Sequence, residues 1–392
     1  MDGSFILVFL EISVMIFIAA VVRSFISRYG FPLLVGEILA GILISPFAIG
    51  GYINQISGYD IFTINDFLLF LSEFSMILLI FASGLEHGIS PLRKTGIWGF
   101  LGATLGAILP FTVATFVYYE SFGIHEALFI GVSLGATSLA AAAAIIQELR
   151  IKSKGVDFLL SASALDDVVD LILLSIVIAI ATSITGRFLI NIFSLIAYFT
   201  ISWLIILVTS VYIIPKIVNL AGDKYVYQLP FVLLFGLTTI MSILGFSPII
   251  SAFIAGVALA ESYTAEKIRS ITEVLLSVFG PIFFVVVGAQ VNLLSINLQT
   301  FGFAIELTII AILFKIIGVF PFAYITLKNF RAALSASIGM VPRGETGLVV
   351  ASIGLANNFI DNNIFTGIVF MALFTTFVGS TIFKRIASWI ID

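Results

Sequence analysis

The sequence predicts an all-α protein whose helices cross a membrane 13 times and leave no stretch for a soluble domain. Hydrophobic residues make up 60% of the 392 residues and charged residues only 10%, whereas about 25% of an average soluble domain is charged. The apolar residues form continuous runs of about 20 residues, the length that a helix needs to span a bilayer. These runs do not alternate between apolar and polar residues, which argues against a membrane β-barrel.

Thirteen apolar runs define the predicted spans. They cover residues 5–22, 32–49, 66–86, 98–119, 126–148, 158–182, 189–214, 229–245, 248–261, 274–290, 301–326, 331–355 and 365–383. The connectors between them are short and hold most of the glycine, asparagine and charge. The first run has no basic segment before it and no small-residue cleavage site after it. We therefore interpret it as a retained membrane helix and not as a cleaved signal peptide.

Basic residues predict the orientation in the membrane. With the N-terminus outside, the cytoplasmic loops hold 15 of the 18 lysines and arginines. These are Arg23, Arg28, Arg93, Lys94, Arg150, Lys152, Lys154, Lys216, Lys224, Lys267, Arg269, Lys328, Arg331, Lys384 and Arg385. The opposite loops hold Arg187, and the spans hold Lys315 and Arg343. Because cytoplasmic loops are enriched in basic residues, we expect a multi-pass protein of the cell membrane with its C-terminus in the cytoplasm.

The two halves of the chain resemble each other. Gly84 and Gly288 are 204 positions apart within similar local sequences. Segments 30–41 and 245–256 share a Gly-Phe pair, a proline and an Ala-Gly pair, at offsets near 215. Equivalent helices would then start on opposite sides of the membrane. Such inverted-topology repeats are typical of secondary transporters.

Charged side chains within spans mark candidate functional positions, because each costs several kcal/mol in hydrocarbon unless it is paired or hydrated. The functional candidates are Asp166, Asp167, Asp170, Lys315, Arg343 and Glu345. We interpret Glu37, Glu73 and Glu306 as structural partners that fix helix packing. The adjacent pair Asp166 and Asp167 is the most informative, because two neighbouring carboxylates cannot both be ionised cheaply without a cation or a lysine nearby.

Two spans are interrupted by residues that disfavour a continuous helix. The fifth carries glycines and hydroxyl side chains between Gly131 and Ser138, and the twelfth carries Gly339, Pro342 and Gly344 at the matching repeat position. Proline disturbs the preceding helical turn, and glycine permits unwinding. Unwound midpoints leave half-helix ends whose partial charges need compensation.

The interruptions predict a transport site. We expect Arg343 and Glu345 to compensate the charge of the half-helix ends. The hydroxyls of Thr137 and Ser138, with carbonyls freed by the unwinding, can help to coordinate a small cation. Interruption by glycine and proline at matching positions of two halves is a pointer to the binding site of a transporter.

Several motifs, taken in order, resemble the monovalent cation:proton antiporter superfamily. They are Phe31–Pro46, Thr137–Ser138, Gln147–Leu149, Asp166–Asp167, Lys315 and Pro342–Leu348. The likeness is to two-aspartate, NapA-type sodium/proton antiporters, and it covers nearly the whole chain. Asp170 departs from that pattern, where we expect a small or apolar residue; it lies one helical turn from Asp166 and can couple to its titration. We expect no nucleotide-binding domain of the kind found in Kef-type potassium efflux systems, because the chain ends soon after Arg385.

The resemblance implies a NhaA/NapA-like fold of 13 helices in two parts, in which two discontinuous helices cross. The core, or ion-translocation, part would comprise residues 98–182 and 301–383. The dimerisation part would comprise residues 5–86 and 189–290 and would form a homodimer surrounded by membrane lipid. Alternating access would come from an elevator-type movement of the core against the dimerisation part.

The implied activity is the exchange of Na⁺ or Li⁺ for protons, which compete for the same carboxylates. We assign Asp167 as the main cation ligand, with Asp166 sharing the ion. Asp166 would pair with Lys315 while the site lacks sodium, and sodium binding would break that pair and release a second proton from the lysine. Exchange of two protons for one sodium would be electrogenic and driven partly by the membrane potential, at about 2.3 kcal/mol per charge per 100 mV.

Other functions stay open at this stage. A potassium/proton antiporter would carry the same motifs, and a cation channel or a symporter without proton coupling would need no buried lysine paired with aspartate. An intramembrane aspartyl protease needs two aspartates that face each other, whereas Asp166 and Asp167 point about 100° apart on one helix. With no cysteine, two histidines and a net charge of −4, we expect no enzyme activity, no cofactor and no nucleic-acid partner.

Overall fold

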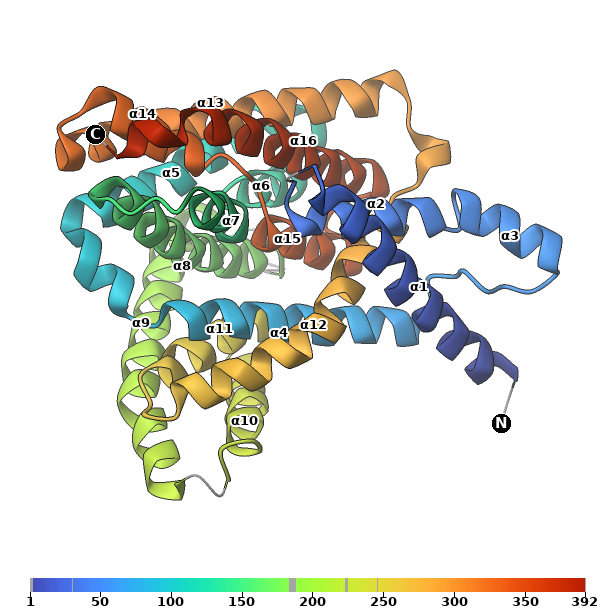
Figure 1. Ribbon diagram of the computed structural model, residues 1–392, viewed down its shortest axis with the longest axis horizontal. Coiled ribbons are helices and arrows are strands. Elements are labelled where there is room, and N and C mark those ends of the chain that lie inside the picture. The colour runs from blue at the N-terminus through green and yellow to red at the C-terminus, as the bar shows by residue number, and fades with distance from the viewer. Residues whose placement is uncertain (1–2, 30, 183–187, 223–224, 245, 392) are drawn as a thin grey trace.

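The computed structural model describes residues 3–29, 31–182, 188–222, 225–244 and 246–391, and these residues form helices without any β-strand (Figure 1). The helices are α1 (Gly3–Ser27), α2 (Leu33–Ile44), α3 (Ile49–Ser57), α4 (Asp66–His87), α5 (Ser90–Phe122), α6 (Ile124–Ser133), α7 (Leu139–Leu149), α8 (Lys154–Thr182), α9 (Phe188–Ala221), α10 (Leu229–Ile243), α11 (Pro248–Ala260), α12 (Ala265–Ala289), α13 (Leu298–Leu327), α14 (Phe330–Gly339), α15 (Glu345–Ala356) and α16 (Asn362–Ile386). Among the residues used above, Gly30, Arg187, Lys224 and Gly245 lie outside the described residues, as do the side chains of Arg93 and Lys94.

Eight helical segments of the described chain are long and apolar enough to cross a membrane, and one of them joins α2 and α3. They lie at Ile6–Ser27, Leu33–Ser57, Asp66–Glu86, Gly96–Phe122, Ala197–Ala221, Ala265–Ser295, Leu298–Leu327 and Asn362–Ile390. Their outer surface carries large apolar side chains, such as Phe116, which is 82% exposed, and Leu220, which is 92% exposed. A surface of this kind suits contact with hydrocarbon, where the helix satisfies its own backbone hydrogen bonds.

Each predicted span overlaps one helix or two consecutive helices. The spans predicted at 126–148 and 331–355 are the divided ones, because α6 and α7 share the first and α14 and α15 share the second. Both interruptions predicted from glycine, proline and hydroxyl residues are therefore confirmed as breaks in helical structure.

The second predicted span and the connector after it were wrong in detail. The span was predicted to reach residue 49, but α2 ends at Ile44, and α3 occupies residues that we had assigned to a connector. Asn54 of α3 explains the difference, because its side chain accepts hydrogen bonds from the backbone N–H groups of Ile61 and Phe62 and donates to the Phe62 carbonyl. These contacts with the returning chain stabilise a glycine-containing helix that has little helix propensity of its own.

The helices pack into two groups. In one, α4 packs on α11 and α12, α2 packs on α12, α1 packs on α2, and α9 and α10 pack on α11. In the other, α5 packs on α6, α8 and α13, α13 packs on α14 and α16, and α15 packs on α6 and α16. Contacts of α8 with α9 and of α4 with α15 join the groups. In Figure 1, α13 and α16 lie along the top of the molecule, and α4, α11 and α12 lie across its lower part.

Glycines permit the closest helix crossings of the first group. A Cβ atom on Gly84 of α4 would meet the Phe253 carbonyl of α11, and one on Gly256 of α11 would meet the Phe81 carbonyl of α4. The pair α2 and α12 repeats this arrangement, with Gly41 on the Val285 carbonyl and Gly288 on the Ile38 carbonyl. An offset of 204 takes Phe81 and Gly84 of α4 to Val285 and Gly288 of α12. An offset of 215 takes Ile38 and Gly41 of α2 to Phe253 and Gly256 of α11. The repeat in sequence therefore corresponds to a repeat in packing.

Candidate functional site

The two helix breaks lie against each other in the second group of helices. Residues 134–138 separate α6 from α7, and residues 340–344 separate α14 from α15. The backbone N–H of Ser138 donates to the Pro342 carbonyl at 2.7 Å. Backbone groups that leave a helix inside a membrane must find partners within the protein, and here each break supplies a partner to the other.

Two glycines allow the breaks to approach neighbouring groups. A Cβ atom on Gly344 would lie 2.5 Å from the Cβ atom of Ser138, and a Cβ atom on Gly135 would collide with Oδ1 of Asp170. Any larger residue at either position would push apart the segments that form the site. The close approach is the physical reason for glycine here, since neither residue has a positive φ.

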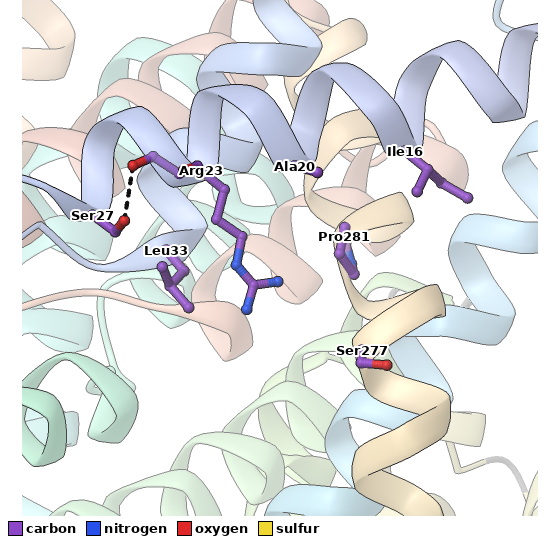
Figure 2. Close-up of a pocket in the computed structure, with 8 residues that line it drawn as sticks. Ile16, Ala20, Arg23, Ser27, Leu33, Ser277 and Pro281 are labelled. Atoms are coloured by element: carbon purple, nitrogen blue, oxygen red, sulfur yellow. Dashed lines mark hydrogen bonds between the residues drawn. The ribbon is translucent and has the colours of Figure 1, made fainter.

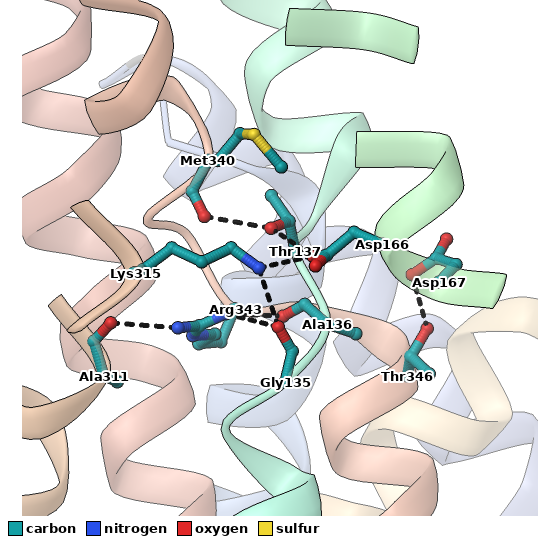
Figure 3. A network of polar contacts seen from close by, with 10 residues as sticks. All are labelled: Gly135, Ala136, Thr137, Asp166, Asp167, Ala311, Lys315, Met340, Arg343 and Thr346. Carbon is teal, nitrogen blue, oxygen red and sulfur yellow. Dashed lines mark hydrogen bonds and ion pairs between the residues drawn. The ribbon is translucent and has the colours of Figure 1, made fainter. Parts of the chain in front are cut away.

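Asp166 of α8 pairs with Lys315 of α13 at the junction of the breaks. Lys315 Nζ lies 2.5 Å from Asp166 Oδ2 and donates to the Gly135 carbonyl at 2.8 Å. Thr137 Oγ1 lies 2.7 Å from the same carboxylate oxygen and 2.9 Å from the Met340 carbonyl. The side chains of Asp166 and Lys315 are both 0% exposed. Figure 3 shows Lys315 reaching from α13 between the unwound segments to this carboxylate.

Arg343 lies within the second break and binds carbonyls of the first. Its Nη1 donates to the carbonyls of Gly135 at 2.8 Å and Ala136 at 3.0 Å, and its Nη2 donates to the carbonyl of Ala311 at 2.9 Å. Gly135 thus accepts from both buried cations, Lys315 and Arg343. A guanidinium at this place offsets the partial negative charge of carbonyls that the end of α6 leaves without helical partners.

Asp167 points away from its neighbour, toward the first group of helices. Thr346 Oγ1 of α15 donates to Asp167 Oδ1 at 3.2 Å, and Ser83 Oγ of α4 lies 3.4 Å from Asp167 Oδ2. In Figure 3, Asp166 is directed at Lys315 while Asp167 is directed at Thr346. The divergence follows from the rotation of about 100° between consecutive helical residues. The two aspartates therefore have different partners: a buried ammonium for one and hydroxyl groups for the other.

A cavity of about 830 Å³ lies between α2, α4, α7 and α12. Ser83 lines it, as does Glu345, the first residue of α15. Its other acidic lining residues are Glu37, Glu86, Glu148 and Glu273. One basic residue, Arg23, also lines the cavity, against five glutamates. An excess of one sign of charge raises the local concentration of counter-ions, so this cavity favours cations over anions.

Asp170 is buried on the same face of α8 as Asp166 and has no hydrogen-bond partner for either carboxylate oxygen within the described part of the chain. It packs on Gly135, the residue whose carbonyl binds both cations. The side chains of Asp166, Asp170, Lys315 and Arg343 thus form a buried group of two acids and two bases. Ser138 is likewise buried, and its hydroxyl faces Glu345.

Of the three glutamates interpreted as structural, two have polar partners and one lines a second cavity. Glu37 Oε1 lies 3.4 Å from Arg23 Nη1, and Glu306 accepts a hydrogen bond from Tyr118 Oη at 3.2 Å. Glu73 lines a cavity of about 460 Å³. Glu37 and Glu306 thus have polar partners, and the structural role of the three glutamates stays a prediction.

The family of the chain follows from a match to a family model over nearly its full length. The family described as "Sodium/hydrogen exchanger, transmembrane" matches residues 14–389. The chain is a member of the sodium/hydrogen exchanger family. The family and the apolar helices together make it a multi-pass membrane protein of the monovalent cation:proton antiporter superfamily, as the motifs indicated.

Relatives in the sodium/hydrogen exchanger family match the chain over nearly its full length. A protein of Enterococcus hirae named Na(+)/H(+) antiporter is 30% identical, and the match covers 96% of this chain and 97% of that one. GerN of Bacillus cereus, named a Na(+)/H(+)-K(+) antiporter, is 28% identical, with 96% and 95% covered. The solved structure of the sodium proton antiporter MjNhaP1 from Methanocaldococcus jannaschii matches the fold with a TM-score of 0.73 at 18% identity, covering 98% and 97% of the two chains.

Two side chains of this exchanger-family site were missed from the sequence. Thr346 and Ser83, the two partners of Asp167, were not among the candidates. Thr346 belongs to the motif Pro342–Leu348, so its hydroxyl beside Glu345 was an available signal. No sequence signal pointed to Ser83, because it lies on α4 in the segment assigned to dimerisation. Only the packing of the helices brings it to α8.

Proposed function

We propose that this chain is a sodium/proton antiporter that exports Na⁺ from the cell in exchange for protons. The observation that carries the proposal is the unequal environment of the adjacent aspartates. Asp166 is held by Lys315, whereas the hydrogen-bond partners of Asp167 in the described part of the chain are two hydroxyls, and one of them, that of Ser83, lines an acidic cavity. An arrangement of this kind leaves one carboxylate free to bind a cation or a proton and gives the other a cation to exchange. The names of the relatives, Na(+)/H(+) antiporters, support the same ions.

The proposed cycle makes Asp167 the main cation ligand. Sodium arrives through the acidic cavity and displaces the proton of Asp167, because one carboxylate cannot hold both. Asp166 then turns one oxygen to the ion, with Thr137 and Ser138 supplying hydroxyl oxygens. Lys315 loses its carboxylate partner, and a buried ammonium without a counter-charge is costly, so the lysine releases the second proton.

Two protons for one sodium would make the exchange electrogenic, and Li⁺ would be accepted as a smaller ion of the same charge. Potassium/proton exchange is the alternative that the relatives support, because the name of GerN includes K(+). Ion preference depends on the number and spacing of oxygens around the ion.

The packing of the helices into two groups supports a transport movement of one group against the other. The core would be residues 98–182 and 301–383, with the discontinuous helices crossing at their breaks, and the dimerisation part residues 5–86 and 189–290. In this proposal the protein has 13 spans with its N-terminus outside, forms a homodimer in the plasma membrane and carries the ion by an elevator-type movement. Ser83 and Asp167 come from opposite parts, so their contact would break when the core moves.

The activity is tested by reconstituting the purified chain in liposomes that contain a pH-sensitive dye. The liposomes are given an acidic interior, and Na⁺, Li⁺ or K⁺ is added outside in turn, so that the entering cation exchanges for protons that leave. We expect Na⁺ to raise the internal pH, and by much more than it does in protein-free liposomes. No response to any of the three cations would overturn the proposal, and a response to K⁺ alone would favour the alternative.

Asp170 is proposed as a modulator and not as a ligand. The change Asp170→Asn keeps the shape of the side chain and removes one negative charge from the buried group of two acids and two bases. We expect exchange to persist, with its pH profile displaced toward acidic pH, because less negative charge makes protons easier to release. The measurement is sodium-dependent proton flux between pH 5 and 9. A loss as complete as that of an Asp167 variant would mean that the wrong pair was assigned.

Glu345 and Arg343 are proposed to compensate the half-helix ends. Glu345 is the first residue of α15, where a negative charge interacts favourably with the helix dipole, typically by about 0.3–1 kcal/mol. We therefore expect Glu345→Gln to lower the melting temperature in detergent by a few degrees and to leave the ratio of Na⁺ to Li⁺ activity unchanged. A changed cation preference would show that Glu345, which lines the cavity, is instead a direct ligand.

A further inference from the structure

A groove between α1 and α12 has a charged end and an apolar end (Figure 2). Helix α12 contributes Ser277 and Pro281, and Leu33 of α2 lies near the polar end. The lining residues from α1 are Ile16, Ala20, Arg23, Ser24 and Ser27. The residues of α1 recur at intervals of three, four or seven, so they lie on one face of the helix. The apolar side chains come first along that face, and the guanidinium and the two hydroxyls follow toward the end of the helix.

The groove lies at the periphery of the molecule. Helix α1 packs on α2 and α12 and leaves most of its apolar surface exposed; Phe9, Phe17 and Phe25, for example, are each more than half exposed. The apolar half of the groove therefore adjoins a surface that suits hydrocarbon, while its polar half lies at the end of α1. The order of polarity is that of a phospholipid, with its acyl chain in the bilayer and its phosphate at the helix end.

Arg23 stands between this groove and the acidic cavity, and it lines both. Its side chain is 38% exposed, and its only carboxylate partner in the described part of the chain is Glu37, with Nη1 and Oε1 3.4 Å apart. A Cβ atom on Gly36 would lie 2.9 Å from the Arg23 Cα, so α2 approaches the backbone of Arg23 closely. The guanidinium has five donors, and one long contact with Glu37 leaves most of them for another acceptor.

We propose that this groove binds an anionic phospholipid, whose phosphate contacts Arg23 and the hydroxyl of Ser24 and whose acyl chain lies along Ala20 and Ile16. Guanidinium and phosphate form strong charge-assisted hydrogen bonds. The lipid phosphate competes with Glu37 for Arg23, so the bound lipid leaves more negative charge in the acidic cavity. The site itself does not depend on which ion the protein transports.

The test uses the full chain in detergent and native mass spectrometry with phosphatidylglycerol or phosphatidylcholine of identical acyl chains. We expect phosphatidylglycerol to be retained in preference to phosphatidylcholine. Arg23→Gln is expected to weaken phosphatidylglycerol binding roughly tenfold, the effect of losing one charge-assisted interaction. Glu37→Gln is expected to strengthen it or leave it unchanged, because the competing carboxylate is gone. Arg385→Gln, which removes an exposed arginine at the end of α16, is the matched control and should change nothing.

Two further measurements separate the possible occupants. Ala20→Phe fills the apolar half without altering charge and should also weaken binding, which keeps the test valid if Arg23→Gln does not fold. Inorganic phosphate alone should not raise the melting temperature, since it lacks the acyl chain. Equal retention of both lipids, phosphatidylglycerol binding unaffected by Arg23→Gln, or full stabilisation by phosphate would each overturn the proposal. So would a parent dimer that retains no lipid and dissociates on Arg23→Gln, because a second copy would then cover the groove.

Discussion

Replacing Asp167 by asparagine is expected to reduce sodium-dependent proton movement to the level of protein-free liposomes. Asparagine keeps the shape of the side chain and its contacts with Thr346 and Ser83, but it can neither bind a proton at neutral pH nor neutralise a sodium ion. The neighbouring Asp166 is held by Lys315 and is not free to take over this role. The measurement is the change of internal pH after sodium addition, at several pH values.

The control for this variant is Asp157→Asn on the same helix. Asp157 is exposed in the first turn of α8, so its loss should leave exchange near the parent level. Binding is measured separately by the rise in melting temperature that sodium causes in detergent, which should vanish for Asp167→Asn alone. A folded Asp167→Asn protein that still exchanges sodium for protons would remove Asp167 from the mechanism.

Replacing Lys315 by glutamine is expected to abolish exchange or to convert it into electroneutral exchange of one proton for one sodium. Lys315 is wholly buried, and its partner Asp166 adjoins the proposed main ligand. If the lysine carries the second proton, its removal takes one charge out of each cycle. The measurement is exchange in proteoliposomes with the membrane potential clamped by valinomycin and potassium, compared with zero potential.

A structural role for Lys315 predicts a different result. The variant would then fold less stably, by about 3–5 kcal/mol for a broken buried pair, yet it would respond to the potential like the parent. The double variant with Asp166→Asn removes the unpaired carboxylate and should recover part of that stability. The difference in stability between the single and the double variant then gives the cost of leaving Asp166 unpaired. Lys384→Gln breaks an exposed pair with Glu148 and should alter neither stability nor charge movement, because exposed pairs contribute little.

The helices and their breaks were predictable because they depend on local composition. Runs of apolar residues specify spans whatever surrounds them, and Pro342 with Gly339 and Gly344 interrupts a helix by its own stereochemistry. The errors came where local signals conflict with packing. Helix α12 begins at Ala265, nine residues before the predicted span, because charged residues such as Glu266 and Arg269 extend a helix past its apolar stretch.

The sequence by itself determined the class of protein, the apolar helices, the two breaks and the candidate charges, because the cost of polar groups in hydrocarbon acts on each residue separately. It also indicated that Asp166 and Asp167 differ, since neighbours on a helix point apart. The family resemblance already paired Asp166 with Lys315, and only the tertiary structure decided that Asp167 meets Thr346 and Ser83. Those contacts join residues more than 80 positions apart, and they depend on how helices cross at glycines such as Gly84 and Gly135, where the absence of a side chain matters only once a neighbour is present.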